Sequence, residues 1–259
     1  MKKARVVVYI FIILCFIFGC MSLKTHTGKK QTKTYFSKTI DHRYKRGADN
    51  FVYLVKTKSE ISCKENDVNP KCVPYLVSSA SGLVLSFDDA SVFILTAAHF
   101  CEYDDKIMPG GEENIIGFAK DQERELTVLA VSKKDDACIM MGPKYENESF
   151  NQIKLARKDP ILGADVYTVA APNGIGGPGF RPIFVGKFAG CDELGCMTTL
   201  PGTFGSSGAG IYNSRGELIT IVMAVSEGFE SLILSPSRKS LHNFILTNDK
   251  LIDIYYYED

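Results

Sequence analysis

The sequence predicts an all-β protein that forms two packed barrels and ends in one C-terminal helix. Short apolar strands recur with turn residues at regular spacing, which is typical of barrels and sandwiches. A polar break at residues 142–151 divides these strands into two sets of about six. The 22 glycines and 10 prolines are spread along the chain, as a turn-rich β protein requires.

The first 23 residues differ in composition from the rest. A basic start precedes an unbroken apolar run from Val6 to Gly19, which matches a secretory signal sequence and is short for a membrane span. Residues 17–20 resemble a bacterial lipoprotein cleavage box with Cys20 as the lipidated residue, although Phe18 is bulky for that motif. Residues 1–23 are therefore a signal peptide, a lipoprotein leader or a signal anchor. We expect a periplasmic, cell-surface or membrane-anchored protein, with a secreted one as the alternative.

Residues 24–48 are polar and basic, which predicts a linker between this leader and a folded domain at residues 49–259. Beside a membrane, the lysines and arginines of the linker could contact anionic lipid headgroups. A solvated linker explains the same composition. The formal net charge of the whole chain is zero, so no global field favours a nucleic-acid partner.

The first barrel is predicted at about residues 49–142. Its expected strands are apolar runs bounded by polar turns, at residues 51–55, 81–87, 91–96, 114–119, 126–131 and 137–141. The second barrel is predicted at about residues 151–236. Its expected strands lie at residues 164–170, 182–187, 196–199, 210–212, 218–224 and 231–234.

After the last predicted strand, the apolar residues recur at the spacing of a helix. Leu241, Phe244 and Ile245 recur at helical spacing and Ser237 is a candidate N-cap, which predicts a helix at about residues 237–246. The apolar and aromatic segment 251–257 is expected to pack onto the second barrel.

Six of the eight cysteines lie beyond the leader, and an exported chain permits disulfides. Two pairs flank short polar loops and are disulfide candidates, Cys63 with Cys72 and Cys191 with Cys196. Cys101 and Cys138 lie in apolar surroundings, which favours buried free thiols. No further ligands lie near either candidate pair, so the sequence predicts no metal site.

Residues 202–211, Gly-Thr-Phe-Gly-Ser-Ser-Gly-Ala-Gly-Ile, hold a serine between glycines ahead of a strand. Glycines there permit a backbone conformation that exposes the hydroxyl and directs N–H groups to one point, as an oxyanion hole needs. A plain glycine- and serine-rich loop is the alternative.

A serine nucleophile needs a base to take its proton. Of the four histidines, only His99 ends a predicted strand. A carboxylate must then fix the imidazole tautomer, and Asp136 lies closer than Asp135 to the buried run at residues 137–141. The structural alternatives are a core histidine and a solvated turn acid.

The motifs Leu95-Thr96-Ala97-Ala98-His99, Asp136-Ala137-Cys138-Ile139 and Gly205-Ser206-Ser207-Gly208-Ala209 resemble, in this order, those of chymotrypsin/trypsin-like serine proteases. The resemblance spans roughly residues 50–246 and implies two six-stranded antiparallel β-barrels with the site between them. It implies His99, Asp136 and Ser207 as the triad and the N–H groups of Gly205 and Ser207 as the oxyanion hole. Ser206 stands where digestive members carry an aspartate, so the pattern is closer to bacterial stress-type, glutamyl-endopeptidase-like or viral members. Cys101 lies one residue beyond the family's usual cysteine, so that disulfide cannot be transferred.

The same resemblance places Thr203, Met223, Ala224 and Val225 along the primary substrate pocket. These residues are uncharged, which favours a small or apolar residue before the scissile bond, whereas Glu227 reaching into the pocket would favour a basic one.

The sequence therefore predicts an exported or membrane-tethered serine endopeptidase that acts on protein or peptide substrates. It implies no cofactor, no metal and no nucleic acid, and membrane contact through the N-terminal segment. The alternatives are a catalytically inactive binding module of the same fold at the cell surface and a lipid-anchored structural surface protein.

Overall fold

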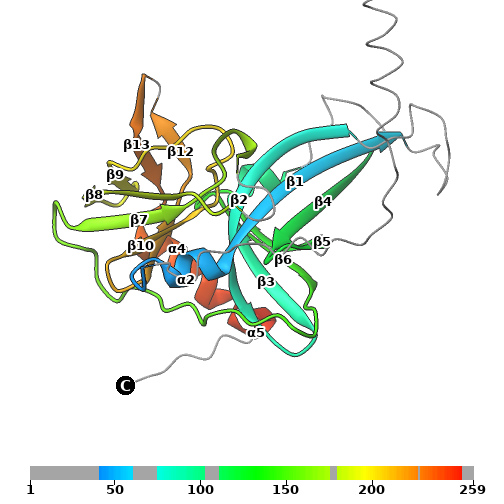
Figure 1. The fold of residues 1–259 in the computed structure, drawn as a ribbon. Helices are drawn as coiled ribbons and strands as arrows, with labels where there is room; N and C mark the ends of the chain where they lie inside the picture. The colour runs from blue at the N-terminus through cyan, green and yellow to red at the C-terminus, as the bar shows by residue number, and fades with distance from the viewer. Residues whose placement is uncertain (1–40, 61–74, 103–110, 176–179, 227, 253–259) are drawn as a thin grey trace, which may run out of the picture. The chain divides into compact units, whose positions relative to one another are not determined.

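The computed structural model describes residues 41–60, 75–102, 111–175, 180–226 and 228–252, all within one compact unit, Ser37–Asp259 (Figure 1). The expectations for residues 1–40 and for segment 253–257 fall outside this part of the chain, as do those for Cys63, Cys72 and Glu227. Within the described ranges, no helix is both long and apolar enough to cross a membrane.

The first half of the domain is a closed antiparallel barrel with the strand order β1-β2-β3-β6-β5-β4. β3 has the predicted bounds, and the other five strands extend their predicted runs because cross-strand pairing continues into the flanking residues. Four of the neighbouring pairs are consecutive strands, whereas β3 pairs with β6 and β1 closes the barrel on β4. The strands are β1 (Phe51–Glu60), β2 (Tyr75–Phe87), β3 (Ser91–Thr96), β4 (Gly111–Ala119), β5 (Gln122–Ser132) and β6 (Ala137–Pro143).

The second half is a curled seven-stranded sheet with the order β11-β10-β7-β8-β9-β13-β12. The all-β fold is thus confirmed, but the predicted strand at residues 218–224 is two strands. The reason is a change of partner: Val222 exchanges main-chain hydrogen bonds with Gly208 and Ala209, whereas the N–H of Met223 donates to Leu234. The strands are β7 (Asp165–Val169), β8 (Ile183–Cys191), β9 (Cys196–Thr198), β10 (Gly210–Asn213), β11 (Leu218–Ile221), β12 (Ala224–Ser226) and β13 (Phe229–Ser235).

A continuous apolar cluster joins the two halves. Leu83, Leu95 and Ile139 of the first barrel pack in it with side chains of the second sheet such as Ile221. All four of these side chains are buried. Burial on this scale fixes how the barrel faces the sheet, and so positions any residues at their junction.

The described chain begins inside the folded domain rather than in a linker. Residues Lys45–Asn50 form helix α2, and Ala48 is fully buried. A Cβ at Gly47 would lie 2.8 Å from the Tyr167 ring, so only glycine permits this close approach. Burial raises the pKa of the Tyr167 hydroxyl to about 12. The predicted linker is therefore wrong at its C-terminal end, because tertiary packing holds residues whose polarity suggested a tether.

The C-terminal helix α4 spans Arg238–Thr247, one residue later than predicted. The hydroxyl of Ser237 accepts a hydrogen bond from the N–H of Ser240 at 3.2 Å, so Ser237 is the N-cap. The helical spacing of the apolar residues buries Leu241 and Ile245 in the junction cluster. Two short helices complete the described fold, α3 (Ala98–Cys101) and α5 (Asp249–Ile252), with a 3-10 turn at Pro172–Gly174.

Candidate active site

His99 lies in α3, the single helical turn that follows β3. Its side chain is half exposed, and its Nδ1 lies 2.8 Å from Oδ2 of Asp136. The main-chain N–H of His99 donates to Oδ1 of the same carboxylate at 2.9 Å. One carboxylate thus holds both the main chain and the ring of His99, which fixes the rotation of the imidazole and directs Nε2 away from Asp136.

Asp136 occupies the last position of the turn before β6, with a left-handed φ of 44°. Aspartate tolerates this conformation better than most residues, and the conformation directs the carboxylate at His99. The neighbouring Asp135 binds elsewhere. It accepts a hydrogen bond from the hydroxyl of Ser132 at 2.6 Å and a second from Ser240 of α4. The structure therefore distinguishes the two acids that the sequence places side by side.

The turn that carries Ser207 has two glycines in the left-handed region, Gly205 (φ 87°) and Gly208 (φ 82°). A Cβ at Gly205 would lie 2.5 Å from the carbonyl oxygen of Ala171, so no other residue fits there. Ser206 is buried, and its hydroxyl accepts from the N–H of Thr203 at 3.3 Å. Ser207 is the partly exposed serine of the pair.

Two N–H groups in this turn remain available for a ligand. The N–H groups of Gly205 and Ser207 donate to no other described residue, whereas those of Ser206, Gly208 and Ala209 each donate to a main-chain carbonyl. Two free N–H donors, two residues apart and beside a partly exposed serine hydroxyl, are the arrangement that an oxyanion hole needs.

The two halves of the domain bring this turn to the start of the His99 helix. A Cβ at Gly208 would lie 2.1 Å from Oγ1 of Thr96 and 2.7 Å from the N atom of Ala97, two residues before His99. No hydrogen bond joins the side chains of Ser207 and His99 in the described structure. Such contacts are often long in unliganded enzymes and shorten when substrate binds.

Ser81 of β2 links the turn to the first barrel. Its N–H donates to the carbonyl of Ser207 at 2.9 Å, and its hydroxyl donates to the carbonyl of Gly205 at 2.7 Å. The hydroxyl also accepts from the N–H of Ala171 at 2.8 Å. The sequence does not single out Ser81, because a serine at the middle of a strand carries no local signal of such a contact.

Val225, one of the predicted substrate-binding residues, lies in a packed site beside Gly202. A Cβ at Gly202 would lie 2.9 Å from Cδ1 of Ile233 and 3.2 Å from Cγ2 of Val225. Thr203 follows Gly202, and Ala224 precedes Val225 on β12. In the described structure β12 pairs with β13 alone, so its other edge is open. Ile233 packs beside Gly202 together with Val225, although the sequence did not single it out.

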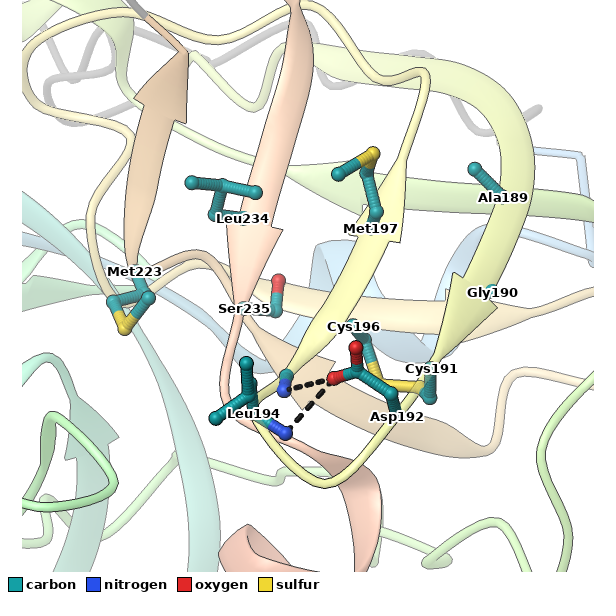
Figure 2. A pocket seen from close by; sticks show the side chains of 11 residues that line it. Ala189, Gly190, Cys191, Asp192, Leu194, Cys196, Met197, Met223, Leu234 and Ser235 are labelled. Atoms are coloured by element: carbon teal, nitrogen blue, oxygen red, sulfur yellow. Dashed lines mark hydrogen bonds between the residues drawn. A yellow bond between two sulfur atoms is a disulfide. The ribbon is translucent and has the colours of Figure 1, made fainter.

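Met223 lies apart from this packed site. Its side chain lines a cavity of about 470 Å³ together with Met197 and Leu234 (Figure 2). The β8–β9 loop borders the cavity, where Asp192 accepts hydrogen bonds from the N–H groups of Leu194 and Gly195. Figure 2 also shows the disulfide between Cys191 and Cys196, so this predicted pairing is present.

The prediction of free thiols at Cys101 and Cys138 is wrong. The two sulfurs form a disulfide between α3 and β6, with the Cα atoms 6.5 Å apart. Cys138 is fully buried and Cys101 partly so, which explains why their apolar neighbours suggested core thiols. Among the described residues, no group of histidines, cysteines and acids has an arrangement that could hold a metal ion.

Comparisons with known proteins bear on the family and the fold. A search of curated protein sequences gave no match. A solved structure described as the serine endoprotease from Yersinia pestis matches with a TM-score of 0.58 at 18% sequence identity. The match covers 82% of this chain and 65% of that one, so the chain spans just under two thirds of its structural relative. The family model described as "Trypsin-like peptidase domain" matches residues 80–221, more than half of the sequence, and the chain therefore belongs to the trypsin-like peptidase family.

Proposed function

We propose that the protein is a serine endopeptidase with Ser207 as nucleophile, His99 as general base and Asp136 as the carboxylate that orients His99. The observation that carries the proposal is the double hydrogen bond from His99 to Asp136, at 2.8 and 2.9 Å. Family membership supports it, because a peptidase domain implies a protein or peptide substrate.

The proposed reaction is acyl transfer. Oγ of Ser207 attacks the carbonyl carbon of the scissile bond while Nε2 of His99 takes the hydroxyl proton. The oxyanion that forms accepts hydrogen bonds from the N–H groups of Gly205 and Ser207. His99 then protonates the leaving amine, and a water molecule activated by the same nitrogen hydrolyses the acyl-enzyme. The Asp136 carboxylate stabilises the imidazolium that forms.

The packed site beside Gly202 favours substrates with a small or apolar residue before the scissile bond. The side chains of Val225 and Ile233 fill the space beside Gly202, which leaves little volume for a large side chain. We retain the main chain of Met223, which directly precedes β12, for substrate binding, together with Thr203, Ala224 and Val225. An extended peptide would pair with the open edge of β12.

A fluorophosphonate probe tests the nucleophile. The probe is expected to label the wild-type chain and to leave Ser207→Ala unlabelled, with loss of cleavage of denatured protein. Ser206→Ala is the matched control, because Ser206 is buried in the same turn, and it should remain labelled. Labelling that persists in Ser207→Ala, or an unlabelled and inactive wild type, would overturn the proposal. The second outcome would favour a binding module of the same fold.

We also propose that the N-terminal segment exports the domain or tethers it to a membrane. The basic start and apolar run of residues 1–19 support this, and Cys20 is the proposed site of lipid attachment. Radiolabelled fatty acid on the wild type but not on Cys20→Ser is expected for a lipoprotein. A mature N-terminus beyond Cys20 would exclude the lipid anchor, and recovery of the intact chain from the cytoplasm would exclude export.

A further inference from the structure

The Cys101–Cys138 disulfide lies directly beside the proposed His99–Asp136 pair. Cys101 follows His99 by two residues in α3, and Cys138 follows Asp136 by two residues at the start of β6. The covalent bond therefore joins the same two segments that the hydrogen bonds from His99 join. Nothing in the local sequence requires such a link, because β3 and β6 already pair along their length.

Tertiary contacts hold the His99 helix, among them the burial of Phe100 in the core of the first barrel. Four residues form α3, and no side chain caps its N-terminus. A single helical turn has little stability of its own, so its position depends on tertiary contacts. One such contact holds the end of the turn: the buried Nζ of Lys56 donates to the carbonyl of Glu102 at 2.7 Å. The disulfide is the only covalent restraint on α3 besides the chain itself within the described structure.

We propose that Cys101 and Cys138 are positioning residues for the reaction, and that reduction of their disulfide lowers the turnover number. The inference rests on the proposed function, since it assigns the two cysteines a role through His99 and Asp136. Neither sulfur contacts substrate. The bond restrains α3 relative to β6, so that Nδ1 of His99 stays in hydrogen-bonding distance of Asp136.

A dithiol supplies the electrons for the reduction. Its thiolate attacks the sulfur of Cys101, which is the more exposed of the two, and releases the thiolate of Cys138. The second thiol of the reductant then attacks the mixed disulfide, which frees Cys101. The net products are two protein thiols and one cyclic disulfide of the reductant. Loss of the Cys101–Cys138 bond itself alters the first barrel, so the proposed substrate-binding residues around Val225 keep their structure.

The expected effect is a loss in kcat with little change in KM. Misplacement of a catalytic group by about 1 Å can cost about 100-fold in rate, so we expect kcat to fall about 10- to 100-fold. Reoxidation should restore it. A disulfide that served stability alone would change the unfolding midpoint and leave kcat of the folded protein unchanged.

The test compares two double variants of the full chain. Cys101→Ala/Cys138→Val removes the positioning bond and keeps apolar volume at the buried site. Cys191→Ala/Cys196→Ala removes the disulfide of the β8–β9 loop and serves as the control. Circular dichroism in the near ultraviolet establishes that each variant is folded at the assay temperature. The first variant should show the fall in kcat and no response to dithiothreitol, whereas the control should keep wild-type kcat and lose it on reduction.

A second readout does not need activity. The proton between Nδ1 of His99 and Asp136 is expected to give a far-downfield proton resonance, which His99→Gln would identify by its loss. The resonance should weaken or vanish in folded Cys101→Ala/Cys138→Val and persist in the control. If the resonance and kcat are unchanged in the folded first variant, the inference is wrong. If the wild type shows the resonance but neither cleaves protein nor reacts with fluorophosphonate, the proposed function fails, and the resonance still decides whether the disulfide positions the pair.

Discussion

Asp135 and Asp136 are adjacent in one turn, yet their carboxylates bind different elements. Asp136 accepts two hydrogen bonds from His99, whereas Asp135 accepts hydrogen bonds from Ser132 and from Ser240 of α4. One acid thus belongs to the proposed site, and the other attaches the C-terminal helix to the first barrel.

Substitution of each acid should separate these roles. Asp136→Asn keeps the shape but favours the wrong imidazole tautomer, so kcat is expected to fall about 10⁴-fold. Asp135→Asn should change kcat far less and lower the free energy of unfolding by about 1 to 3 kcal/mol, since it weakens hydrogen bonds to a charged group. Steady-state kinetics and urea titration of both variants check this. Equal losses of activity in the two would contradict the assignment.

Gly208→Ala is expected to prevent folding of the native turn. The new Cβ would lie 2.1 Å from Oγ1 of Thr96 and 2.3 Å from the carbonyl oxygen of Ser81, besides the cost of the left-handed φ. Gly163→Ala is the matched control, because its φ is also left-handed, at 79°, with no atom within 4 Å of the new Cβ. The control should lose about 1 to 2 kcal/mol of stability by urea titration and stay soluble. A similarly small loss for Gly208→Ala would show that the turn can shift.

The stability of the domain should depend on His242. Burial in α4 lowers the pKa of this histidine from 6.5 to about 4. Between these values the unfolded chain binds a proton that the folded chain does not, so stability decreases as the pH falls from 6.5 towards 4. The loss from this group is on the order of 3 kcal/mol at pH 4.

The neutral variant His242→Gln isolates this effect. Its free energy of unfolding at neutral pH is expected to be lower than that of the wild type, but its further loss on acidification should be smaller. Urea titrations at pH 7.5 and pH 4.5 measure the difference. Parallel acid losses in the two proteins would mean that the histidine is protonated in the fold.

Removal of one charge from the buried pair Lys56 and Glu113 should lower the stability more than removal of both. Their charged atoms lie 3.6 Å apart, and both side chains are at least nine-tenths buried. Lys56→Met leaves the Glu113 carboxylate without this partner and is expected to cost about 3 to 5 kcal/mol. Lys56→Met/Glu113→Leu should recover much of that loss, because no unpaired charge remains. A double variant that is less stable than the single one would contradict this.

Sequence patterns predicted the elements that depend on local signals. Short apolar runs bounded by turn residues indicated the strands, the spacing of Leu241 and Ile245 indicated α4, and Ser237 indicated where α4 begins. The positions of His99 and Asp136 also followed from motifs, because each lies where a strand meets a turn. Their motifs do not show that the two residues lie beside each other, because only the closed barrel brings them together.

Features that depend on contacts distant in sequence were not predictable. Cys101 and Cys138 are 37 residues apart, and their apolar neighbours suit a free thiol as well as a disulfide. The polar composition of α2 hid the close approach of Gly47 to Tyr167, which only the fold creates. Ser81 likewise contacts the Ser207 turn across more than 120 residues of chain.

The contacts of Ser81 have a consequence for how activity could arise. Because this residue of the first barrel supplies hydrogen bonds to Gly205 and Ser207, the second sheet alone lacks the groups that complete its own turn. If the chain were divided in the polar segment between β6 and β7, both fragments would be inactive, because each would hold only some of the proposed catalytic residues. Peptide cleavage would then report their reassociation, and during synthesis the protein would stay latent until the last strands had left the ribosome and docked.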